Sequence, residues 1–240
     1  MQVQIGRLRR LARPRRIVYP EGDDPRIRAA AQRLAREGLA EPILIGRGRP
    51  QDGLRYVDPE TSPDTNRYAA LYYERRKARG VTEREAARIA RRPLYFAALM
   101  VAAGDADGTV GGAANSTAET VRAALHAIGT APGVRTVSGF FVMALPRREW
   151  GVRGLFIFSD CAVVVAPRAC ELAEIALAAA GSVRTLLEAE PKIAMLACSM
   201  EAVADDRQAE KVRLAFEEIR QRAPQLHTLC AGDAAQALEA

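Results

Sequence analysis

The sequence predicts an α/β protein built from doubly wound parallel sheets. Strand-like apolar runs alternate with helix-like segments along the chain after residue 16, and no internal repeat interrupts them. A length of 240 residues allows one large domain or two modest ones. Contents of 49% hydrophobic and 27% charged residues are ordinary for a globular protein and exclude wholesale disorder. No apolar run reaches the roughly 18 residues of a membrane span, so we expect no membrane partner.

A β-α-β unit opens the alternation. Residues 16–24 (RIVYPEGDD) predict a short strand that runs into a polar turn, and Pro25 stands where a helix begins. A short apolar strand over 42–46 follows, bounded by Pro and Gly. Two strands joined by a helix indicate a parallel sheet. The apolar residues between the strands recur at roughly helical spacing: Ile27, Ala30, Leu34 and Leu39.

The later segments keep the same order. Residues 46–63 are rich in loop formers and include a short strand near 54–57. Thr82 with Glu85 forms a capping box, which predicts a helix start. Further predicted helices span 66–79, 93–103, 116–128, 169–187 and 206–222. Further predicted strands span 108–110, 134–145, 154–158, 192–197 and 226–230. Pro, Arg and Gly interrupt the apolar pattern near 146–151, so we expect two domains, 1–147 and 148–240.

The positive charge of the chain is concentrated at its start. Residues 1–16 hold six arginines and no acid, and the remainder is neutral, with 29 residues of each sign. This segment has no aromatic residue, whereas nucleic-acid binding is typical of a basic stripe with base-reading partners. We therefore favour a solvated first helix and expect no nucleic-acid partner, with nucleic-acid binding as a weaker alternative. A mitochondrial presequence would usually be rich in Ser, which this segment lacks.

The cysteines and histidines do not predict a metal centre. Four Cys are widely spaced without a C-x-x-C pair, and only His126 and His227 are available as histidine partners. We expect no metal and no disulfide framework, because a chain of this length can form a core without one. No apolar signal-peptide core is present. A reduced, cytoplasmic setting fits best.

The segment 105–124 (DADGTVGGAANSTAETVRAA) is the most informative for chemistry. A strand ends at Gly111 and Gly112, and the chain enters a helix at Asn115, Ser116 and Thr117. The amides and dipole of a helix start attract anions such as phosphate, and Arg122 can reach back toward the same opening. No Gly-Lys-Ser/Thr follows, so this is not a nucleotide P-loop. The alternative is an ordinary capped helix.

A second basic cluster ends an earlier helix. It consists of Arg75, Arg76, Lys77 and Arg79. Positive charges at this position complement the helix dipole, which is the alternative to a role in ligand binding.

From Arg16 to about Cys198 the sequence resembles the phosphate acetyl/butyryl transferase family. The stretches that carry the resemblance are RIVYPEGDDPRIRAAAQRL, EPILIG, YYERRKARGVTEREA, RRPLYFAALMVAAGDADGTVGGAANSTAETVRAALHAIGTAPGVRTVSGFFVMALP and FIFSDCAV. The resemblance implies two α/β/α domains with a cleft between them, similar to isocitrate and isopropylmalate dehydrogenases, in a homodimer. It also implies acetyl transfer from acetyl-CoA to phosphate by direct attack, without an acyl-enzyme and without a tightly bound cofactor.

The resemblance also implies roles for particular residues. The family's functional arginines fall on Arg76 and Arg122. The hydroxyl-bearing turn of the family falls on Ser116 and Thr117. We expect further contacts with acetyl-CoA or phosphate from Gly112, Asn115 and Asp160, so the 1–147 domain carries the phosphate- or CoA-binding loop. Arginine suits phosphate because its planar guanidinium binds in a bidentate manner.

The sequence departs from the family's pattern at three places. The family's distal segment, with Leu-Ser-Arg-Gly and a following general-base Asp, is not in the sequence. Residues 164–167 (VVAP) replace Asn-Pro-Asn-Pro, and Glu201 stands where a Lys is usual, a change that weakens anion binding. Without the distal segment the first domain is incomplete, so we expect uncovered apolar surface and an open strand edge there.

Three functions remain open from the sequence. The first is a phosphate acetyltransferase acting on acetyl-CoA and phosphate. The second is a non-catalytic CoA- or phosphate-binding protein, or a fragment of a longer enzyme. The third is a phosphate acyltransferase for a longer acyl group, such as butyryl or propionyl, because the sequence does not define the size of the acyl pocket.

Overall fold

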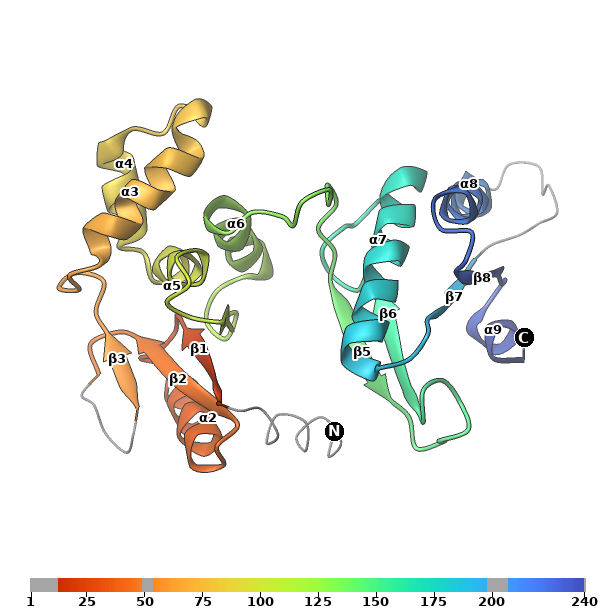
Figure 1. Ribbon diagram of the computed structural model, residues 1–240, viewed down its shortest axis with the longest axis horizontal. Coiled ribbons are helices and arrows are strands. Elements are labelled where there is room, and N and C mark those ends of the chain that lie inside the picture. The colour runs from red at the N-terminus through yellow and green to blue at the C-terminus, as the bar shows by residue number, and fades with distance from the viewer. Residues whose placement is uncertain (1–12, 49–53, 198–206, 240) are drawn as a thin grey trace. The chain divides into compact units, whose positions relative to one another are not determined.

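The computed structural model describes residues 13–48, 54–197 and 207–239. The chain divides into two compact units, Met1–Thr130 and Ala131–Ala240, each described here by itself (Figure 1). The Arg-rich segment 1–12 and residues 198–206, with Glu201, lie outside the described residues. The predictions about that first helix and that charge reversal therefore stay predictions.

A four-stranded parallel sheet forms the centre of the first unit. Its strands are β1 (Arg15–Tyr19), β2 (Ala40–Ile45), β3 (Arg55–Val57) and β4 (Gly108–Thr109), in the spatial order β3-β2-β1-β4. From β1 the chain proceeds outward to β2 and β3, and then returns to the other side of β1 as β4. The strand order therefore reverses between β1 and β4, which confirms the predicted doubly wound α/β architecture for this unit.

Helices cover both faces of this sheet (Figure 1). Successive strand residues point to opposite faces, so Leu44 packs with Ala31 of α2 (Pro25–Arg36) on one face. Ile43 and Ile45 pack on the other face, in the core formed with the remaining helices. Those helices are α3 (Thr65–Arg76), α4 (Glu83–Ala90), α5 (Pro93–Ala102) and α6 (Thr117–Ala127), with a short 3-10 turn over Lys77–Arg79.

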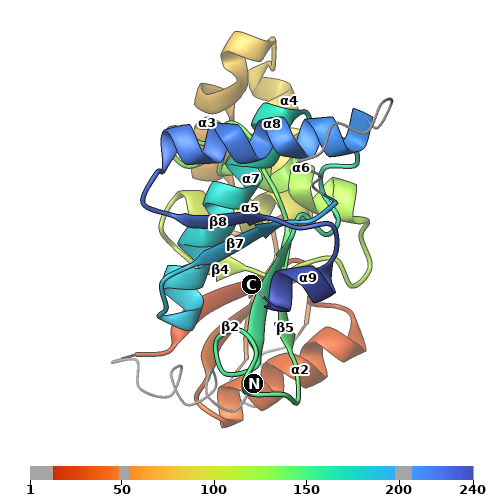
Figure 2. The same cartoon turned by 90° about the vertical axis from the view of Figure 1, so that its right-hand side faces the viewer.

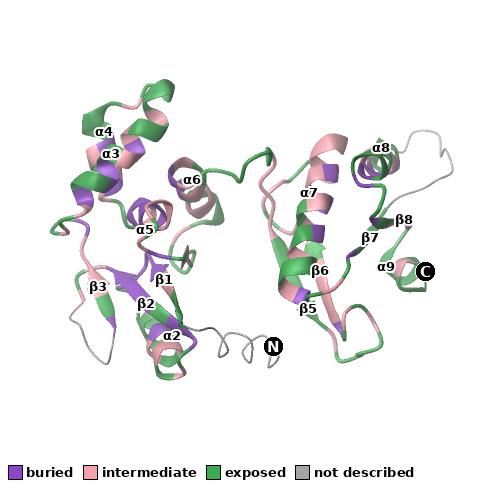
Figure 3. Ribbon diagram, viewed as in Figure 1, coloured by how far each residue is buried: buried purple, intermediate pink, exposed green. Residues whose placement is uncertain are grey.

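Local sequence signals define the helix starts. The Asp24 side chain accepts a hydrogen bond from the Arg26 amide, and Pro25 occupies the first turn of α2. Thr82 and Glu85 form the predicted capping box of α4. Helix α5 is apolar on all sides because it lies in the middle of the core, as its purple colour in Figure 3 shows.

In its described residues the second unit combines two two-stranded sheets with helices (Figure 2). Strands β5 (Phe140–Ala144) and β6 (Leu155–Ser159) pair antiparallel, and β7 (Lys192–Met195) and β8 (His227–Cys230) pair parallel. Helices α7 (Ala169–Ser182) and α8 (Arg207–Arg222) share a core centred on Phe216 and Ile219. A π-helical turn over Val183–Leu187 extends α7, and a short α9 (Ala234–Glu239) that was not predicted ends the unit.

The units divide earlier in the chain than the boundary expected after residue 147. The apolar stretch of β5 pairs with β6 and therefore belongs to the second unit. The interruption near 146–151 is the connection of this hairpin. Of the strand predicted over 134–145, only Phe140–Ala144 is regular.

Exposed apolar side chains gather on β5 rather than in the first unit. Every residue of β5 is exposed, and Phe141 keeps 57% of its surface accessible (Figure 3). Among the described residues of the first unit, the exposed large apolar side chains are Val110 and Leu125. The residues of β5 lie before the boundary expected after residue 147, but they belong to the second of the two compact units. The expectation of uncovered apolar surface in the first domain therefore stays a prediction. Such patches are typical of surfaces that contact another chain or segment.

The cysteines differ in part from expectation. Cys161 and Cys170 are free thiols, whereas Cys230 is disulfide-bonded, which was not expected. Among the described residues no helix is both long and apolar enough to cross a membrane.

Candidate functional site

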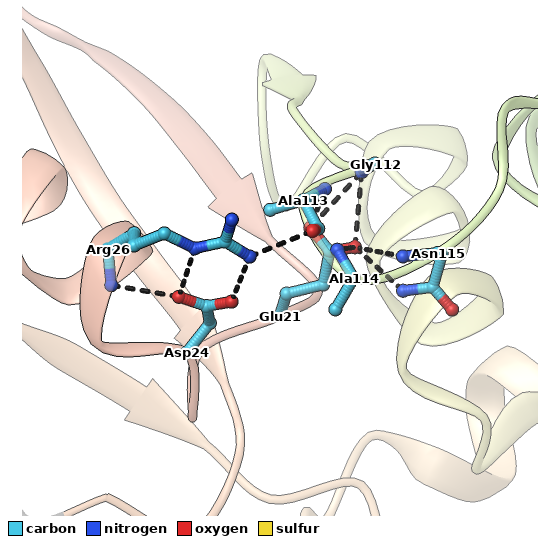
Figure 4. A network of polar contacts seen from close by, with 7 residues as sticks. All are labelled: Glu21, Asp24, Arg26, Gly112, Ala113, Ala114 and Asn115. Carbon is cyan, nitrogen blue, oxygen red and sulfur yellow. Dashed lines mark hydrogen bonds and ion pairs between the residues drawn. The ribbon is translucent and has the colours of Figure 1, made fainter.

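The carboxylate of Glu21 fills the loop that follows β4 (Figure 4). Its oxygens accept hydrogen bonds from the backbone amides of Gly112, Ala113, Ala114 and Asn115 at 2.8–3.2 Å. Asn115 Nδ2 donates one more at 2.8 Å. We call residues 112–115 the amide cradle. The amides that the sequence analysis assigned to a phosphate are bound here to a carboxylate of the same chain.

Close backbone packing brings Glu21 to the amide cradle. A Cβ at Gly22 would lie 2.6 Å from the Ile45 carbonyl oxygen, so only glycine fits this turn. Gly112 has a φ of +110°, which also favours glycine. Pro20 lies against Gly111, where a Cβ would come within 2.9 Å of its ring. The turn after β1 and the loop after β4 are therefore pressed together.

A second side chain holds the carbonyl side of the same loop. Arg26 Nη2 donates to the Ala113 carbonyl oxygen at 2.9 Å and pairs with Asp24 at 2.7 Å (Figure 4). Glu21 is 8% exposed and Arg26 is exposed, so the two residues hold the loop from its buried and open sides. The loop is fixed through both its N–H and its C=O groups.

The hydroxyl of Ser116 serves the start of α6. Ser116 Oγ accepts from the Glu119 amide at 3.3 Å and donates to the Glu119 carboxylate at 2.7 Å, which completes the predicted capping box. The Ser116 amide donates to the same carboxylate at 3.0 Å. Thr117 is exposed in the first turn. The two hydroxyls thus stand on the helix that carries Arg122.

Aromatic and imidazole rings from three helices lie beside Arg92. The Arg92 guanidinium lies 5.3 Å from the centre of the Tyr95 ring. The Tyr95 ring meets Tyr72 edge to face at 5.7 Å and lies 6.3 Å from His126. Tyr72 Oη is 3.5 Å from His126 Nδ1. This group therefore connects α3, α5 and α6.

Three arginines act electrostatically on residues of α3 and α6, and each pair of them has one such residue in common. Burial lowers the pKa of His126, and the charges of Arg76 and Arg122 lower it further. Burial raises the pKa of Tyr72, and the charges of Arg76 and Arg92 oppose this rise. Hydrogen bonds from Ser116 lower the pKa of Glu119, helped by the charges of Arg92 and Arg122. We call Arg76, Arg92 and Arg122 the arginine cluster.

The arginine cluster has unmet hydrogen-bonding capacity. Arg76 Nε is buried and has no hydrogen-bond partner. In the described part of the chain none of the three arginines forms an ion pair. Arg67 lies near the other end of α3 from Arg76 and instead forms ion pairs with both Asp64 and Asp105. Arginines that form no ion pair keep N–H donors for an anion, and a guanidinium binds phosphate in a bidentate manner.

Asp160 belongs to the second unit and organises a turn there. Its carboxylate accepts hydrogen bonds from the amides of Gly139 at 2.9 Å, Ala162 at 3.2 Å, Val163 and Val164. Burial opposes ionisation of this carboxyl, but these amides outweigh it and lower the pKa of Asp160. Its oxygens are thus engaged with backbone in the 160–164 turn.

The structure brings part of the expected site together. Arg76 and Arg122 act on the same histidine, as a shared site requires. Gly112 and Asn115 meet at Glu21. Ser116 and Thr117 begin the helix of Arg122. Asp160 lies in the other unit.

Sequence reasoning missed Glu21, Arg92 and His126. Glu21 follows the first strand of a parallel sheet, and residues at the carboxyl ends of such strands meet at one edge. That position was the available signal. Arg92 precedes the helix-starting Pro93, and His126 lies four residues after Arg122 on the same helical face. Neither position carries a recognisable motif.

Two other features of the described residues carry no catalytic assignment. No group of His, Cys, Asp or Glu among them is arranged to hold a metal ion. A cavity of about 450 Å³ beside the start of α3 is lined in part by Asp64, Tyr68 and Asp105. Asp105 is already bound there by Arg67 and Tyr68, and neither Arg76 nor Arg122 lines this cavity.

Comparison with known proteins identifies the family. The model of the family described as "Phosphate acetyl/butaryl transferase" matches residues 3–236. The chain belongs to this family. Among phosphate acetyl/butaryl transferases, the phosphate acetyltransferase of Paracoccus denitrificans is 45% identical over 212 residues, which are 88% of this chain and 66% of that protein. The phosphate acetyltransferase of Thermoanaerobacterium thermosaccharolyticum is 40% identical, over 85% of this chain and 65% of that protein.

A solved phosphate acetyl/butaryl transferase relative has the same fold. The phosphotransacetylase of Streptococcus pyogenes superposes with a TM-score of 0.82 at 34% identity, covering 95% of this chain and 72% of that one. The chain spans about two thirds of the length of the curated transferases that it matches.

Proposed function

We propose that the protein transfers an acetyl group between coenzyme A and inorganic phosphate, and that the arginine cluster binds the phosphate. The observation that carries this proposal is that Arg76, Arg92 and Arg122 come from the three helices that bring Tyr72, Tyr95 and His126 together, and form no ion pair in the described residues. Membership of the phosphate acetyl/butaryl transferase family supports it. Coenzyme A is a substrate in this proposal, and no tightly bound cofactor is required.

In the proposed reaction a phosphate oxygen attacks the carbonyl carbon of acetyl-CoA. The new C–O bond forms as the C–S bond breaks, and the proton of hydrogen phosphate ends on the sulfur of CoA. The products are acetyl phosphate and free CoA. Negative charge develops on the carbonyl oxygen during the attack, and fixed guanidinium groups lower the energy of such a transition state. They also hold phosphate in position for attack.

His126 contributes to this site as a neutral group. Its lowered pKa keeps the imidazole uncharged near pH 7, so it adds no further repulsion to the arginines. Its contact with Tyr72 fixes the ring between α3 and α6. In the proposal the side chains of His126 and Tyr72 lie beside Arg76 and restrict the position of its guanidinium group.

The test is thiol release from acetyl-CoA with and without phosphate. Wild type, Arg122→Ala and Arg28→Ala are compared; Arg28 is exposed on α2, which covers the opposite face of the sheet. We expect phosphate-dependent release from wild type and Arg28→Ala. The Arg122→Ala variant should lose at least about tenfold in kcat/KM, since a charged hydrogen bond contributes about 1.5–3 kcal/mol.

Other outcomes identify the alternatives. CoA binding without thiol release by a folded chain would indicate a binding protein. Faster turnover of butyryl-CoA or propionyl-CoA than of acetyl-CoA would indicate a longer acyl substrate. Phosphate-dependent release that survives Arg122→Ala unchanged would contradict the assigned site.

We also propose that the protein forms a homodimer in the cytoplasm. The exposed apolar strand β5 supports an interface. The absence of an apolar signal-peptide core from the sequence favours the cytoplasm, whereas the disulfide of Cys230 argues against it. Light scattering should give twice the monomer mass of 26.0 kDa, and Phe141→Lys should lower it. A wild-type monomer would contradict the proposed dimer.

A further inference from the structure

The amide cradle occupies the position where proteins of this architecture bind ligands. In doubly wound sheets the ligand crevice lies outside the carboxyl ends of the strands, where the strand order reverses. Here that point falls between β1 and β4. Glu21 follows β1, and the amide cradle follows β4. The chain therefore places its own carboxylate where an anionic ligand would be expected.

We propose that Glu21 is a positioning residue whose carboxylate is the permanent anion of the amide cradle and sets the start of α6, so that Arg122 joins the arginine cluster. The substrate anion then binds at the arginine cluster and not at the amide cradle. The part of this inference that concerns phosphate rests on the proposed function; the part that concerns Glu21 and α6 does not.

The bonding of Glu21 explains why it stays in place. Four backbone amides and one side-chain amide converge on two oxygens, and the residue is 8% exposed. Hydrogen bonds to an ionised acceptor are shorter and stronger than neutral ones. A displaced carboxylate would leave its donors to a competing anion and would itself need a new partner. At the arginine cluster an incoming phosphate meets positive charge and does not compete with the Glu21 carboxylate.

The same bonds connect Glu21 to the arginine cluster through one rigid helix. Asn115, which gives Glu21 both its backbone and its side-chain amide, directly precedes Ser116, the N-cap of α6. Arg122 and His126 lie on α6, within three turns of that cap. A shift of Asn115 therefore moves both residues relative to Arg76 on α3.

The test uses chemical rescue in Glu21→Ala. Formate, a carboxylate small enough for the vacated space, is titrated against chloride at matched ionic strength. Three quantities are measured: the thermal midpoint Tm, the pKa of His126 by NMR, and the affinity for inorganic phosphate by calorimetry. Asp23→Ala is the matched control, because Asp23 is an exposed carboxylate in the same turn.

We expect formate to act on Glu21→Ala and not on wild type or Asp23→Ala. In the variant without formate, Tm falls, the pKa of His126 rises toward its ordinary value near 6.5, and phosphate binds about tenfold more weakly. Saturating formate reverses all three changes. If Glu21→Ala does not fold, Glu21→Gln, which keeps one acceptor oxygen, is used and should show smaller changes in the same directions.

Two results would overturn the inference. If formate raises Tm but does not change the pKa of His126, then Glu21 stabilises the loop without positioning α6. Tighter phosphate binding by Glu21→Ala than by wild type would mean that the amide cradle is itself the phosphate site. Failure of the proposed function looks different: wild type would release no thiol, while formate would still restore Tm and the pKa of His126 in Glu21→Ala.

Discussion

Arg92 differs from the other two members of the arginine cluster in how it is held. Arg76 is half-buried on α3 and Arg122 is exposed on α6, but Arg92 lies over the Tyr95 ring at the start of α5. Stacking on an aromatic face suits the flat guanidinium, and an ammonium group does not reproduce it. The stacked ring restricts where the charge of Arg92 can point.

Replacing Arg92 should therefore weaken phosphate binding. We expect Arg92→Gln to raise the Kd for phosphate about tenfold, within the range of a charged hydrogen bond. Arg92→Lys should recover only part of the affinity, because it keeps the charge but not the planar stacking. Isothermal calorimetry measures both. Arg84→Gln, an exposed position on α4, is the control, and an Arg92→Gln affinity equal to that of wild type would remove Arg92 from the site.

The ionisation of Glu21 makes stability depend on pH. Burial opposes its ionisation, but the amides of Ala114, Asn115, Ala113 and Gly112 outweigh this effect and lower its pKa. A depressed pKa in the folded state adds stability above the unfolded value of about 4.3, and that stability is lost as pH falls through the folded value.

Urea unfolding at several pH values checks this sign. The difference in unfolding free energy between wild type and Glu21→Gln should be constant near neutral pH and shrink as pH falls below about 4.3. The glutamine variant has no charge to lose at this position. A difference that grows on acidification would contradict the lowered pKa.

The grouping of Ser116, Thr117 and Arg122 was predictable because a single helix and its cap contain them. The resemblance to the family added Arg76, and the roles of these residues stay predictions. The occupancy of the amide cradle was not predictable, because Glu21 is more than 90 residues from its donors in sequence. A glycine loop before a helix has the same appearance whether its anion comes from solvent or from the chain.

Among the elements, helices α4 and α6 begin with the same kind of capping box. Ser116 and Glu119 satisfy each other's backbone amides, as Thr82 and Glu85 do on α4. The two capping boxes have the same chemistry, but only α6 carries a member of the arginine cluster next to its cap. Comparing a substitution in the α4 cap with one in the α6 cap therefore distinguishes loss of helix stability from loss of ligand binding.

Substitutions at the two caps should have equal cost and unequal consequences. Ser116→Ala and Thr82→Ala should each lose about 1 kcal/mol of unfolding free energy in urea titrations. Only Ser116→Ala should also weaken phosphate binding. Ser116→Asn should restore stability, because Asn caps helices as well as Ser does. If Ser116→Asn restores stability but not phosphate affinity, the hydroxyl itself contacts phosphate and the capping role alone is insufficient.

Elements with a local start or stop signal were predicted well. Pro25 and Pro93 begin helices, both capping boxes formed, and the strands at 42–46 and 154–158 appear within a residue or two. The stretch 134–145 was overextended because apolar content alone does not show where a strand finds a partner. Helix α9 is capped by Asp233, whose carboxylate accepts from the Gln236 amide at 2.9 Å, but it has no buried residue, so no apolar periodicity indicates it.

At the scale of the whole molecule, each unit has a main hydrophobic core of its own among the described residues. The core around Phe96 belongs to the first unit, and the core around Phe216 belongs to the second. The aromatic residues divide in the same way: all six Tyr lie before residue 100, and the single Trp is Trp150 in the second unit. Each unit therefore has its own optical probe.

We expect the two probes to report different unfolding midpoints in urea. Trp150 fluorescence follows the second unit and tyrosine absorbance follows the first. Units with separate cores need not unfold as one two-state transition. Glu21→Gln should move the tyrosine midpoint and leave the Trp150 midpoint in place. Coincident midpoints that shift together in this variant would show that the units unfold as one.

The α/β class followed from the alternation of strands and helices, but the division of the chain did not. Residues 140–144 looked like the end of the first domain, since nothing in their composition shows that they pair forward with β6. The parallel sheet of the first unit was predictable from its β-α-β pattern. The antiparallel hairpin of the second unit depends on a connection whose Pro and Gly also suit a domain boundary.

The contact between Glu21 and the amide cradle also bears on folding kinetics. The amide donors lie 91 to 94 residues after Glu21 in the sequence, so this contact forms only after β4 has paired with β1. Contacts that close such long loops come late, after more local helices and strand pairs. Bonds absent from the transition state slow unfolding and leave the folding rate unchanged. Glu21 then determines how long the folded first unit persists, rather than how quickly it forms.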